Sequence, residues 1–314
     1  MKREKVKVIV VTYNSVDYIF ACLKSLDRAT ENFDLHITFV DNASTDTTLA
    51  AIISGKGKAN IEIISNSDNL GYAYGNNLAI EAMLSEEFQY AAVLILNPDV
   101  TLSFGIIDKL LLVLHLSEEV GAVSPNVIEP SQSPDRRVPI NSLWGRPMKK
   151  RFMKHENIIE VDRLHGGCML VKPDLFKKIG AFDDAYFLYW EEIDLCQRAR
   201  KAGYKLLQCY DVVAAHEGDS KSGRYRSHRI YYMWRNQFYF AFKTFWMPLA
   251  CLFLIRKILS NFKEAIGYLG MKRFDLIYAG VAGWKAGMLG EIGQSESFYA
   301  KPVRVECDEN NSGQ

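Results

Sequence analysis

Small polar residues follow four strand-like runs in the first hundred residues, at the point where each run ends. The first run spans 5–12 and ends at Thr12, with Tyr13 and Asn14 directly after it. The carboxyl ends of parallel strands lie along one edge of a sheet, where open α/β sheets bind their ligands. We therefore expect these residues to converge in space. The other three ends carry Asp41 and Asn42, then Asn69 and Gly71, then Asn97 and Asp99.

The fourth of these ends carries a lone carboxylate after a rigid turn. The aliphatic run 93–96 is typical of a buried strand, and it stops at Asn97-Pro98-Asp99. Asn-Pro and Pro-Asp are ordinary turn formers, which is the simpler explanation of the motif. A carboxylate fixed at a sheet edge would also suit Mg²⁺ or Mn²⁺, which are held by one or two carboxylates together with phosphate and water.

The elements that must position these residues alternate between strand and helix. Helical spacing of apolar residues separates the first strands from one another. This alternation predicts right-handed βαβ units and a mostly parallel sheet covered by helices on both faces. The expected strands are 5–12, 35–40, 61–65, 90–96, 122–127, 166–171 and 205–214, and the expected helices are 15–29, 46–54, 74–88, 106–116, 173–179 and 191–202.

Composition excludes several classes of protein. A formal net charge of +1 over 314 residues argues against a protein that binds nucleic acid through overall charge. The six cysteines form no Cys-x-x-Cys pair, which favours a reducing compartment over a disulfide framework or a structural zinc site. The length allows one α/β domain with an appendage, or two modest domains.

The first turn excludes the common glycine-rich nucleotide sites. Thr12-Tyr13-Asn14-Ser15 contains no glycine, whereas a dinucleotide fold needs Gly-x-Gly-x-x-Gly at this turn. A sugar-phosphate nucleotidyltransferase would also place a glycine-rich loop here, and the chain has no P-loop. A nucleotide held by side chains and a metal ion is the alternative that remains.

Six stretches of the chain carry a family resemblance, namely "VIVVTYNS", "VDNASTD", "NLGYAYGNN", "LNPDV", "GGCMLVKPDLFKKIGAFDDAYFLYWEEIDLCQRARKAGYKL" and "AAHEGDSKS". They resemble family 2 glycosyltransferases, most closely the bacterial rhamnosyltransferase-like branch. The resemblance extends over about residues 5 to 240, in order. It implies a GT-A fold, a nucleotide-diphosphate-sugar donor, a divalent metal and inversion at the anomeric carbon.

The resemblance also implies roles for the strand-end residues. Asp99 stands where the family carries its Asp-x-Asp metal motif, of which only the last carboxylate is present here, and His216 resembles a family histidine near the metal. Gly167 would lie near the donor or acceptor sugar. The nucleoside pocket would be lined by Thr12, Tyr13, Asn14, Asp41, Asn42, Asn69, Gly71 and Asn97.

The same resemblance places the catalytic base at Trp190-Glu191-Glu192. Glu192 occupies the position of the family's base, which is usually an aspartate, and Asp194 is the alternative. One carboxylate that takes the acceptor's proton is sufficient for an inverting displacement. Acidic residues in the first turn of a helix are also favourable for structural reasons. The arginines expected at the leaving diphosphate are Arg224, Arg229 and Arg235.

The predicted organisation is a GT-A catalytic domain at 1–228, with a nucleotide-binding half at 1–99 and an acceptor-binding half at 100–228. A helical region follows at 229–300, and 301–314 is a polar tail. The proline-containing segment 129–160 is expected to act as a lid that selects the acceptor. The apolar run 245–255 is too short to span a bilayer. Part of the helical region could instead lie on a membrane, with Lys243, Arg256, Lys257 and Lys263 facing anionic headgroups.

The sequence therefore predicts a metal-assisted, inverting glycosyltransferase in the cytoplasm, peripheral at the inner face of the plasma membrane. The first choice of donor is dTDP-rhamnose, and the acceptor is a cell-surface polysaccharide or a lipid-linked glycan. Alternative donors are UDP-galactofuranose, UDP-glucose and UDP-N-acetylglucosamine. An alternative of another class is a non-catalytic nucleotide-sugar-binding subunit. The sequence predicts no oligomeric state.

Overall fold

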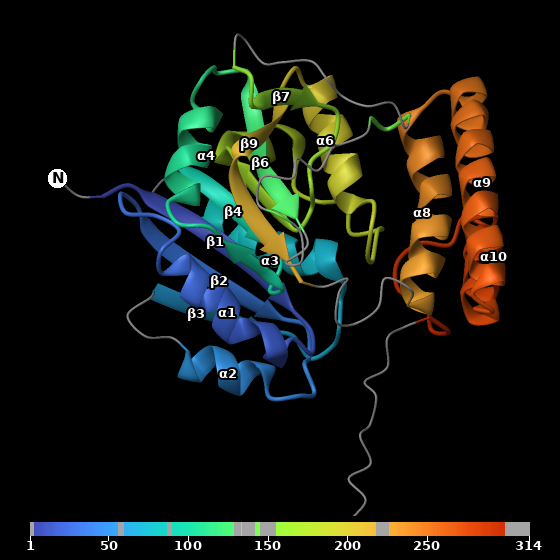
Figure 1. The fold of residues 1–314 in the computed structure, drawn as a ribbon, viewed down its shortest axis with the longest axis horizontal. Helices are drawn as coiled ribbons and strands as arrows, with labels where there is room; N and C mark the ends of the chain where they lie inside the picture. Colours follow the sequence, from blue (N-terminus) through green and yellow to red (C-terminus); the bar gives the residue numbers. More distant parts are fainter. Residues whose placement is uncertain are drawn as a thin grey trace, which may run out of the picture.

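Four parallel strands form the half of the sheet that carries the strand-end residues. The structure, a computed structural model, describes residues 3–55, 60–86, 90–128, 133, 142–144, 155–217 and 226–298. Within them β1 pairs with both β2 and β4, and β2 pairs with β3, all in parallel. The four strand ends therefore share one edge, as predicted (Figure 1). The strands are β1 (Lys5–Thr12), β2 (Asp34–Asp41), β3 (Asn60–Ser65) and β4 (Ala92–Leu96).

The second half of the sheet mixes strand directions, which corrects the expectation of a mostly parallel sheet. The order is β3-β2-β1-β4-β8-β6-β9-β5, with β7 paired to β9. Only β6 and β9 are parallel in this half, and β8 runs antiparallel to both of its neighbours. No crossover helix leads into β8, so the βαβ rule does not fix its direction. The strands are β5 (Val100–Leu102), β6 (Val120–Ile128), β7 (Ile158–Val161), β8 (Cys168–Val171) and β9 (Lys205–His216).

Helices cover both faces of the sheet, as the alternating pattern predicts. On one face α1 (Val16–Leu26), α2 (Thr48–Ser54) and α4 (Ile106–Leu114) bury their apolar sides in a single core. On the other face α3 (Tyr72–Leu84), α5 (Pro173–Ile179) and α6 (Glu191–Lys201) form a second core. The helix α6 is important for the site because its first turn carries Glu191 and Glu192.

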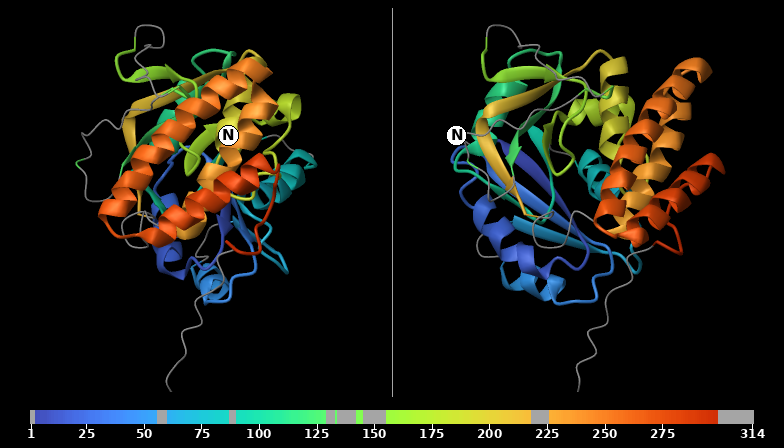
Figure 2. Two further views of the ribbon diagram at one scale, coloured as in Figure 1. Left: turned by 90° about the vertical axis from the view of Figure 1, so that its right-hand side faces the viewer. Right: turned by 45° about the vertical axis from the view of Figure 1, so that its right-hand side comes forward.

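Three C-terminal helices form a layer beside the α/β domain. They are α8 (Ser227–Thr244), α9 (Met247–Gly270) and α10 (Phe274–Met288). Figures 1 and 2 show α8 next to the domain, with α9 and α10 on the outside. Phe240 and Phe253 pack with Trp190, which precedes α6, so this layer contacts the domain at the start of α6. The predicted division of the chain at residue 228 stays a prediction.

Among the described residues, no helix is both long and apolar enough to cross a membrane. The polar tail 301–314 and most of the expected lid 129–160 lie outside the described residues.

Candidate functional site

Hydrogen bonds connect the ends of the first two strands. Asp41, buried at the end of β2, accepts from the Thr12 hydroxyl (2.8 Å) through Oδ1 and from the Ser44 backbone N–H (2.9 Å) through Oδ2. Asn14 has a φ of 48°, in the left-handed region that asparagine tolerates better than most residues. Its Oδ1 accepts from the Thr45 backbone N–H (2.8 Å). The β1 and β2 loops therefore support each other.

The third strand end is connected to the second in the same way. The buried Asn42 donates through Nδ2 to the Gly71 carbonyl (2.9 Å), and it accepts from Asn66 Nδ2 (2.8 Å). The Gly71 backbone N–H donates to Asn69 Oδ1 (3.0 Å). The structure thus brings the predicted nucleoside residues of the first three strands together, and Tyr13 lies half-buried beside them. Their contact with a nucleotide stays a prediction.

Two buried oxygen atoms at the fourth strand end lack hydrogen-bond partners. They are Asn97 Oδ1 and Asp99 Oδ1. His216 Nε2 lies 3.2 Å from Asp99 Oδ1, although the pair does not have the orientation of a hydrogen bond. Buried polar atoms are normally hydrogen-bonded, so oxygen atoms without a hydrogen-bond partner are candidate ligands for a cation. Carboxylate and amide oxygen atoms are hard ligands that fit Mg²⁺ or Mn²⁺. In the described residues no three His, Cys, Asp or Glu side chains cluster as a complete metal site.

The turn Gly166–Gly167 lies between the end of β4, which carries Asn97 and Asp99, and Glu192 at the start of α6. A Cβ at Gly167 would lie 3.0 Å from Asn97 Nδ2, and a Cβ at Gly166 would lie 3.0 Å from Glu192 Cγ. The Asn97 backbone N–H also donates to the Gly167 carbonyl (2.9 Å). Glycine at both positions therefore lets the β4 end and the start of α6 approach the same turn.

Tyr72, the first residue of α3, contacts the same glycine turn. Its hydroxyl donates to the Gly166 carbonyl (3.0 Å). The pKa of Tyr72 is raised well above its usual value, mainly by burial and further by the charges of Glu191, Glu192 and Asp99. All three carboxylates therefore raise the pKa of one side chain, whose hydroxyl contacts the glycine turn.

Burial also raises the pKa of both glutamates at the start of α6. Loss of solvation is the main cause for Glu192, and the positive charge of Arg163 opposes it. The pKa of Glu191 is raised well above its usual value by burial and by the charge of Glu192. Glu191 Oε2 has no hydrogen-bond partner. A carboxylate with a raised pKa holds a transferred proton better, which suits a general base.

The backbone immediately before α6 is strained and is held by α8. Tyr189 and Trp190 have φ values of 66° and 80°, which large side chains rarely adopt. Asn236 on α8 donates through Nδ2 to the carbonyls of Leu188 (2.9 Å) and Tyr189 (2.8 Å). Trp190 Nε1 donates to the Met233 carbonyl (3.0 Å). The helix α8 therefore fixes the direction in which α6 presents Glu192.

We expect Asn236→Ala to lower kcat for transfer about 10-fold or more and to destabilise the fold by about 1–3 kcal/mol. The buried carbonyls of Leu188 and Tyr189 would lose their donor, and the strained residues before Glu191 would relax. Steady-state kinetics and thermal unfolding measure the two effects. Asn32→Ala, at an exposed surface site, serves as the control. An unchanged kcat in a folded Asn236→Ala protein would show that α8 does not position the base.

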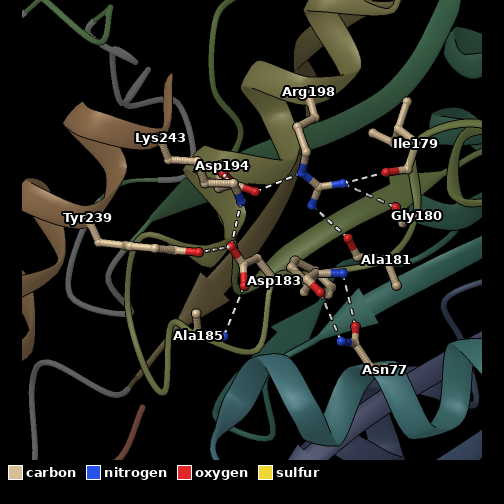
Figure 3. A network of polar contacts seen from close by, with 11 residues as sticks. Asn77, Ile179, Gly180, Ala181, Asp183, Ala185, Asp194, Arg198, Tyr239 and Lys243 are labelled. Carbon is tan, nitrogen blue, oxygen red and sulfur yellow. Dashed lines mark hydrogen bonds and ion pairs between the residues drawn. The ribbon is translucent and has the colours of Figure 1, made fainter. Parts of the chain in front are cut away.

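Asp194, the alternative base, belongs to a network of ion pairs and hydrogen bonds that connects α6 to its neighbours (Figure 3). Its side chain is only 2% exposed, and its two carboxylate oxygens pair with Arg198 Nε (2.7 Å) and Lys243 Nζ (2.7 Å). Arg198 also donates to the carbonyls of Ile179 and Ala181. Asp194 thus connects α6 to α8 and to the loop after α5. This argues against the alternative assignment, because Asp194 is buried and both of its carboxylate oxygens are already engaged by cations.

The arginines predicted at the diphosphate lie in different places. Arg235 is 1% exposed, donates to the Gly293 carbonyl (2.7 Å) and lies 4.7 Å from the centre of the Tyr232 ring. It stabilises the helical layer, which corrects the expectation that it faces the diphosphate. Arg229 lies over the Tyr189 ring at 5.7 Å, next to the start of α6. Arg224 lies outside the described residues.

Sequence reasoning missed three residues of the site, namely Tyr72, Arg163 and Asn236. Tyr72 lies within a quoted family motif, but the resemblance assigned it no role. Arg163 precedes the glycine turn by three residues, and its positive charge favours the ionised form of Glu192. Asn236 lies in the middle of an aromatic helix, where a buried amide is the one signal that could have indicated a structural contact.

Characterised proteins of similar sequence transfer sugars. The chain is 28% identical over 245 residues to the low-salt glycan biosynthesis hexosyltransferase Agl10 of Haloferax volcanii, covering 75% of each chain. It is 30% identical over 241 residues to the N-acetylglucosaminyl-diphospho-decaprenol L-rhamnosyltransferase of Mycobacterium tuberculosis, covering 69% of this chain and 77% of the relative.

The fold is that of the GT-A glycosyltransferases. The mannosyltransferase PcManGT from Pyrobaculum calidifontis, solved with GDP-Man and Mn²⁺, superposes with a TM-score of 0.58 at 17% identity, covering 93% of this chain and 89% of that one. The family model for glycosyl transferase family 2 matches residues 7–180, which contain the four strand ends and the glycine turn. The chain belongs to glycosyl transferase family 2 and is a glycosyltransferase.

Proposed function

We propose that this glycosyltransferase moves rhamnose from dTDP-rhamnose to a lipid-linked or cell-surface glycan by a metal-assisted, inverting single displacement. The observation that carries the proposal is the turn Gly166–Gly167, which has Asn97 against one glycine and Glu192 against the other. A diphosphate beside Asp99 and an acceptor hydroxyl beside Glu192 would therefore be adjacent. The mycobacterial rhamnosyltransferase supports the choice of donor sugar.

In this mechanism the chain binds the donor, orients the donor and the acceptor, and supplies one base. Asp99 would hold Mg²⁺ or Mn²⁺ with His216 beside it, and a bound ion would neutralise charge on the leaving diphosphate. Glu192 accepts the proton of the acceptor hydroxyl as that oxygen attacks the anomeric carbon, and the diphosphate leaves from the opposite side. The network of Thr12, Asp41 and Asn42 would hold the nucleoside against the sheet edge.

We also propose that the outer face of the helical layer lies on an anionic membrane surface. Six apolar residues recur on α9 at helical spacing, and each is between 51% and 69% exposed. From α9 to α10, residues 247–288 contain six basic and two acidic side chains. The net positive charge of this segment would repel a second copy of the chain and would favour contact with anionic lipid headgroups. The stripe consists of Leu252, Ile255, Leu259, Phe262, Ile266 and Leu269.

The proposed location is the cytoplasmic side of that membrane. In the described residues Cys22, Cys168, Cys196 and Cys209 are buried thiols and Cys251 is exposed, and none of them is in a disulfide. Unpaired cysteines are typical of a reducing compartment.

A thermal-shift panel tests the proposed donor. The panel contains dTDP-rhamnose, UDP-galactofuranose, UDP-glucose, UDP-N-acetylglucosamine and GDP-mannose, each with Mn²⁺ or with EDTA. We expect dTDP-rhamnose with Mn²⁺ to give the largest rise in melting temperature, since a ligand of the native state stabilises by mass action. A larger rise with a UDP-sugar would contradict the choice of rhamnose. The absence of any rise would contradict the proposed donor site.

A further inference from the structure

A cavity of about 630 Å³ lies between α8 and α9, next to the start of α6. Its wall contains the basic residues Arg229, Lys257 and Lys263 and the aromatic residues Trp190 and Trp234. Pockets of this volume hold small molecules or cofactors. Neither the donor site at the sheet edge nor the apolar stripe of α9 includes this cavity.

The ammonium group of Lys257 has no carboxylate partner among the described residues. Its Nζ lies 5.1 Å from the centre of the Trp190 ring and 5.3 Å from that of Phe253. Burial and the positive charges of Arg163 and Arg256 lower the pKa of Lys257 to about 8. A cation held among aromatic rings and other cations is stabilised when an anion binds beside it.

The other charges of the cavity do not neutralise Lys257. Glu264 is the one acidic residue in the described wall, and its Oε2 accepts from Trp234 Nε1 (3.2 Å). Three basic residues against one acidic residue give the wall a net positive charge. Phosphate groups are the ligands that such a mixture of lysine and arginine commonly binds.

The cavity is next to the proposed base. Trp190 contributes to its wall and is followed directly by Glu191 and Glu192. The positive charge of Arg163 lowers the pKa of both Glu192 and Lys257. A ligand anchored at Lys257 could therefore present a hydroxyl group to Glu192. Lys257 is two residues from both Ile255 and Leu259, so the exposed apolar stripe lies on the opposite side of α9, and an attached lipid chain would reach it only by passing around a helix about 10 Å wide.

We propose that the cavity between α8 and α9 binds the phosphate of a lipid-linked acceptor, with Lys257 as its main contact and Arg229 and Lys263 as supporting cations. The proposal rests on the proposed function, because it assigns a phosphate-bearing lipid as the acceptor. It makes Lys257 a residue that determines acceptor specificity.

Acceptor kinetics test the proposal. The acceptors are a prenyl-diphosphate-linked N-acetylglucosamine and an alkyl N-acetylglucosaminide without phosphate, both in neutral detergent. We expect Lys257→Gln to raise KM for the diphosphate acceptor about 10- to 100-fold, as for loss of a charge-assisted contact. KM for the phosphate-free acceptor and for the donor should change less than about twofold. Lys257→Arg keeps the charge and should restore most of the affinity.

Lys285→Gln is the matched control. Lys285 is an exposed lysine on α10 outside the cavity wall, so its loss changes the charge of the helical layer by the same amount. An equal rise of KM for both acceptors in Lys257→Gln would overturn the proposal, because it would indicate a structural role. Equal effects of Lys257→Gln and Lys285→Gln would overturn it too, because general electrostatics would explain them.

A binding measurement separates this proposal from the proposed function. The melting temperature is measured with farnesyl diphosphate in EDTA, with saturating dTDP to fill the donor site. Farnesyl diphosphate should raise the melting temperature of the wild type and of Lys285→Gln but not that of Lys257→Gln. Farnesol should raise the melting temperature of none of the three proteins. A wild type that binds farnesyl diphosphate in this way but transfers no sugar would refute the proposed function alone. If Lys257→Gln loses only its binding to phosphatidylglycerol vesicles, the cavity binds a headgroup and the acceptor assignment is wrong.

Discussion

Asp99→Ala is expected to lower kcat/KM for sugar transfer about 1,000-fold, equivalent to about 4 kcal/mol of transition-state stabilisation. The same substitution should leave the melting temperature nearly unchanged. Asp99 Oδ1 makes no hydrogen bond, and the backbone carbonyl that accepts from the Glu217 N–H remains in the variant. Loss of activity without loss of stability is what removal of a metal ligand should produce.

Initial rates measured over a range of Mn²⁺ concentrations provide the test of Asp99. The wild type should saturate with Mn²⁺, and Asp99→Ala should show little response. Asp174→Ala, at an exposed carboxylate on α5, is the matched control and should behave as the wild type. Full activity of Asp99→Ala at saturating Mn²⁺, or of the wild type in EDTA, would contradict the role assigned to Asp99.

Glu192→Gln is expected to lower kcat about 100- to 10,000-fold, the usual contribution of a general base. The amide keeps the shape of the side chain against Gly166 but cannot accept the acceptor's proton. Donor affinity, measured by titration calorimetry, should remain close to that of the wild type because Glu192 does not contact the nucleotide in this account. The exposed Glu118→Gln is the control. More than a tenth of the wild-type kcat in Glu192→Gln would exclude Glu192 as the base.

The pH dependence of wild-type activity is an independent test of Glu192. A base must be ionised to act, and burial raises the pKa of Glu192 above that of an ordinary glutamate. Activity should therefore be present at high pH and should fall as pH decreases through that raised pKa. The acidic limb of kcat/KM against pH should lie above the normal glutamate range of about 4.3. An acidic limb at or below that range would show that the ionisation of another group controls the rate.

The edge of the sheet that carries the four strand ends could be predicted because its determinants are local. Each strand in the first hundred residues is an apolar run, and each intervening helix has a periodic apolar side. Parallel pairing then brings Asp41 and Asp99 to one edge without further information. The family motifs add the start of α6 to this edge, and the glycine turn confirms that Glu192 and Asn97 approach a common segment.

The roles of the charged residues beyond that edge depend on contacts between distant segments. Asp194 lies two residues after Glu192 and has the same chemistry, but its partner Lys243 is on α8 and approaches only when the helical layer packs against α6. Arg235 resembles a phosphate ligand in the sequence and is buried among tyrosines in the fold. Neither environment has a local signal, because ion pairs across packed helices leave no periodicity in the chain.

Strand direction in the second half of the sheet was unpredictable for a related reason. The strands β6 and β8 are not connected by the βαβ units that fix the handedness and direction of β1 to β4. The antiparallel pairing of β8 with β4 nevertheless matters for the site. It brings Gly167 next to the end of β4, where the Gly167 carbonyl accepts from the Asn97 N–H.

Proton NMR of the transferred sugar would test the central claim most directly, namely that Glu192 as the single base, with Asp99 as the residue that would hold a metal ion at the leaving diphosphate, supports an inverting displacement. The wild type would be incubated with Mn²⁺, dTDP-rhamnose and the prenyl-diphosphate-linked acceptor. We predict a single glycosidic product whose anomeric configuration is opposite to that of the donor, and no product from Glu192→Gln on the same timescale. A product that retains the donor's configuration would contradict the account, because retention requires either a second displacement or attack from the side of the leaving diphosphate, and the proposed mechanism contains neither.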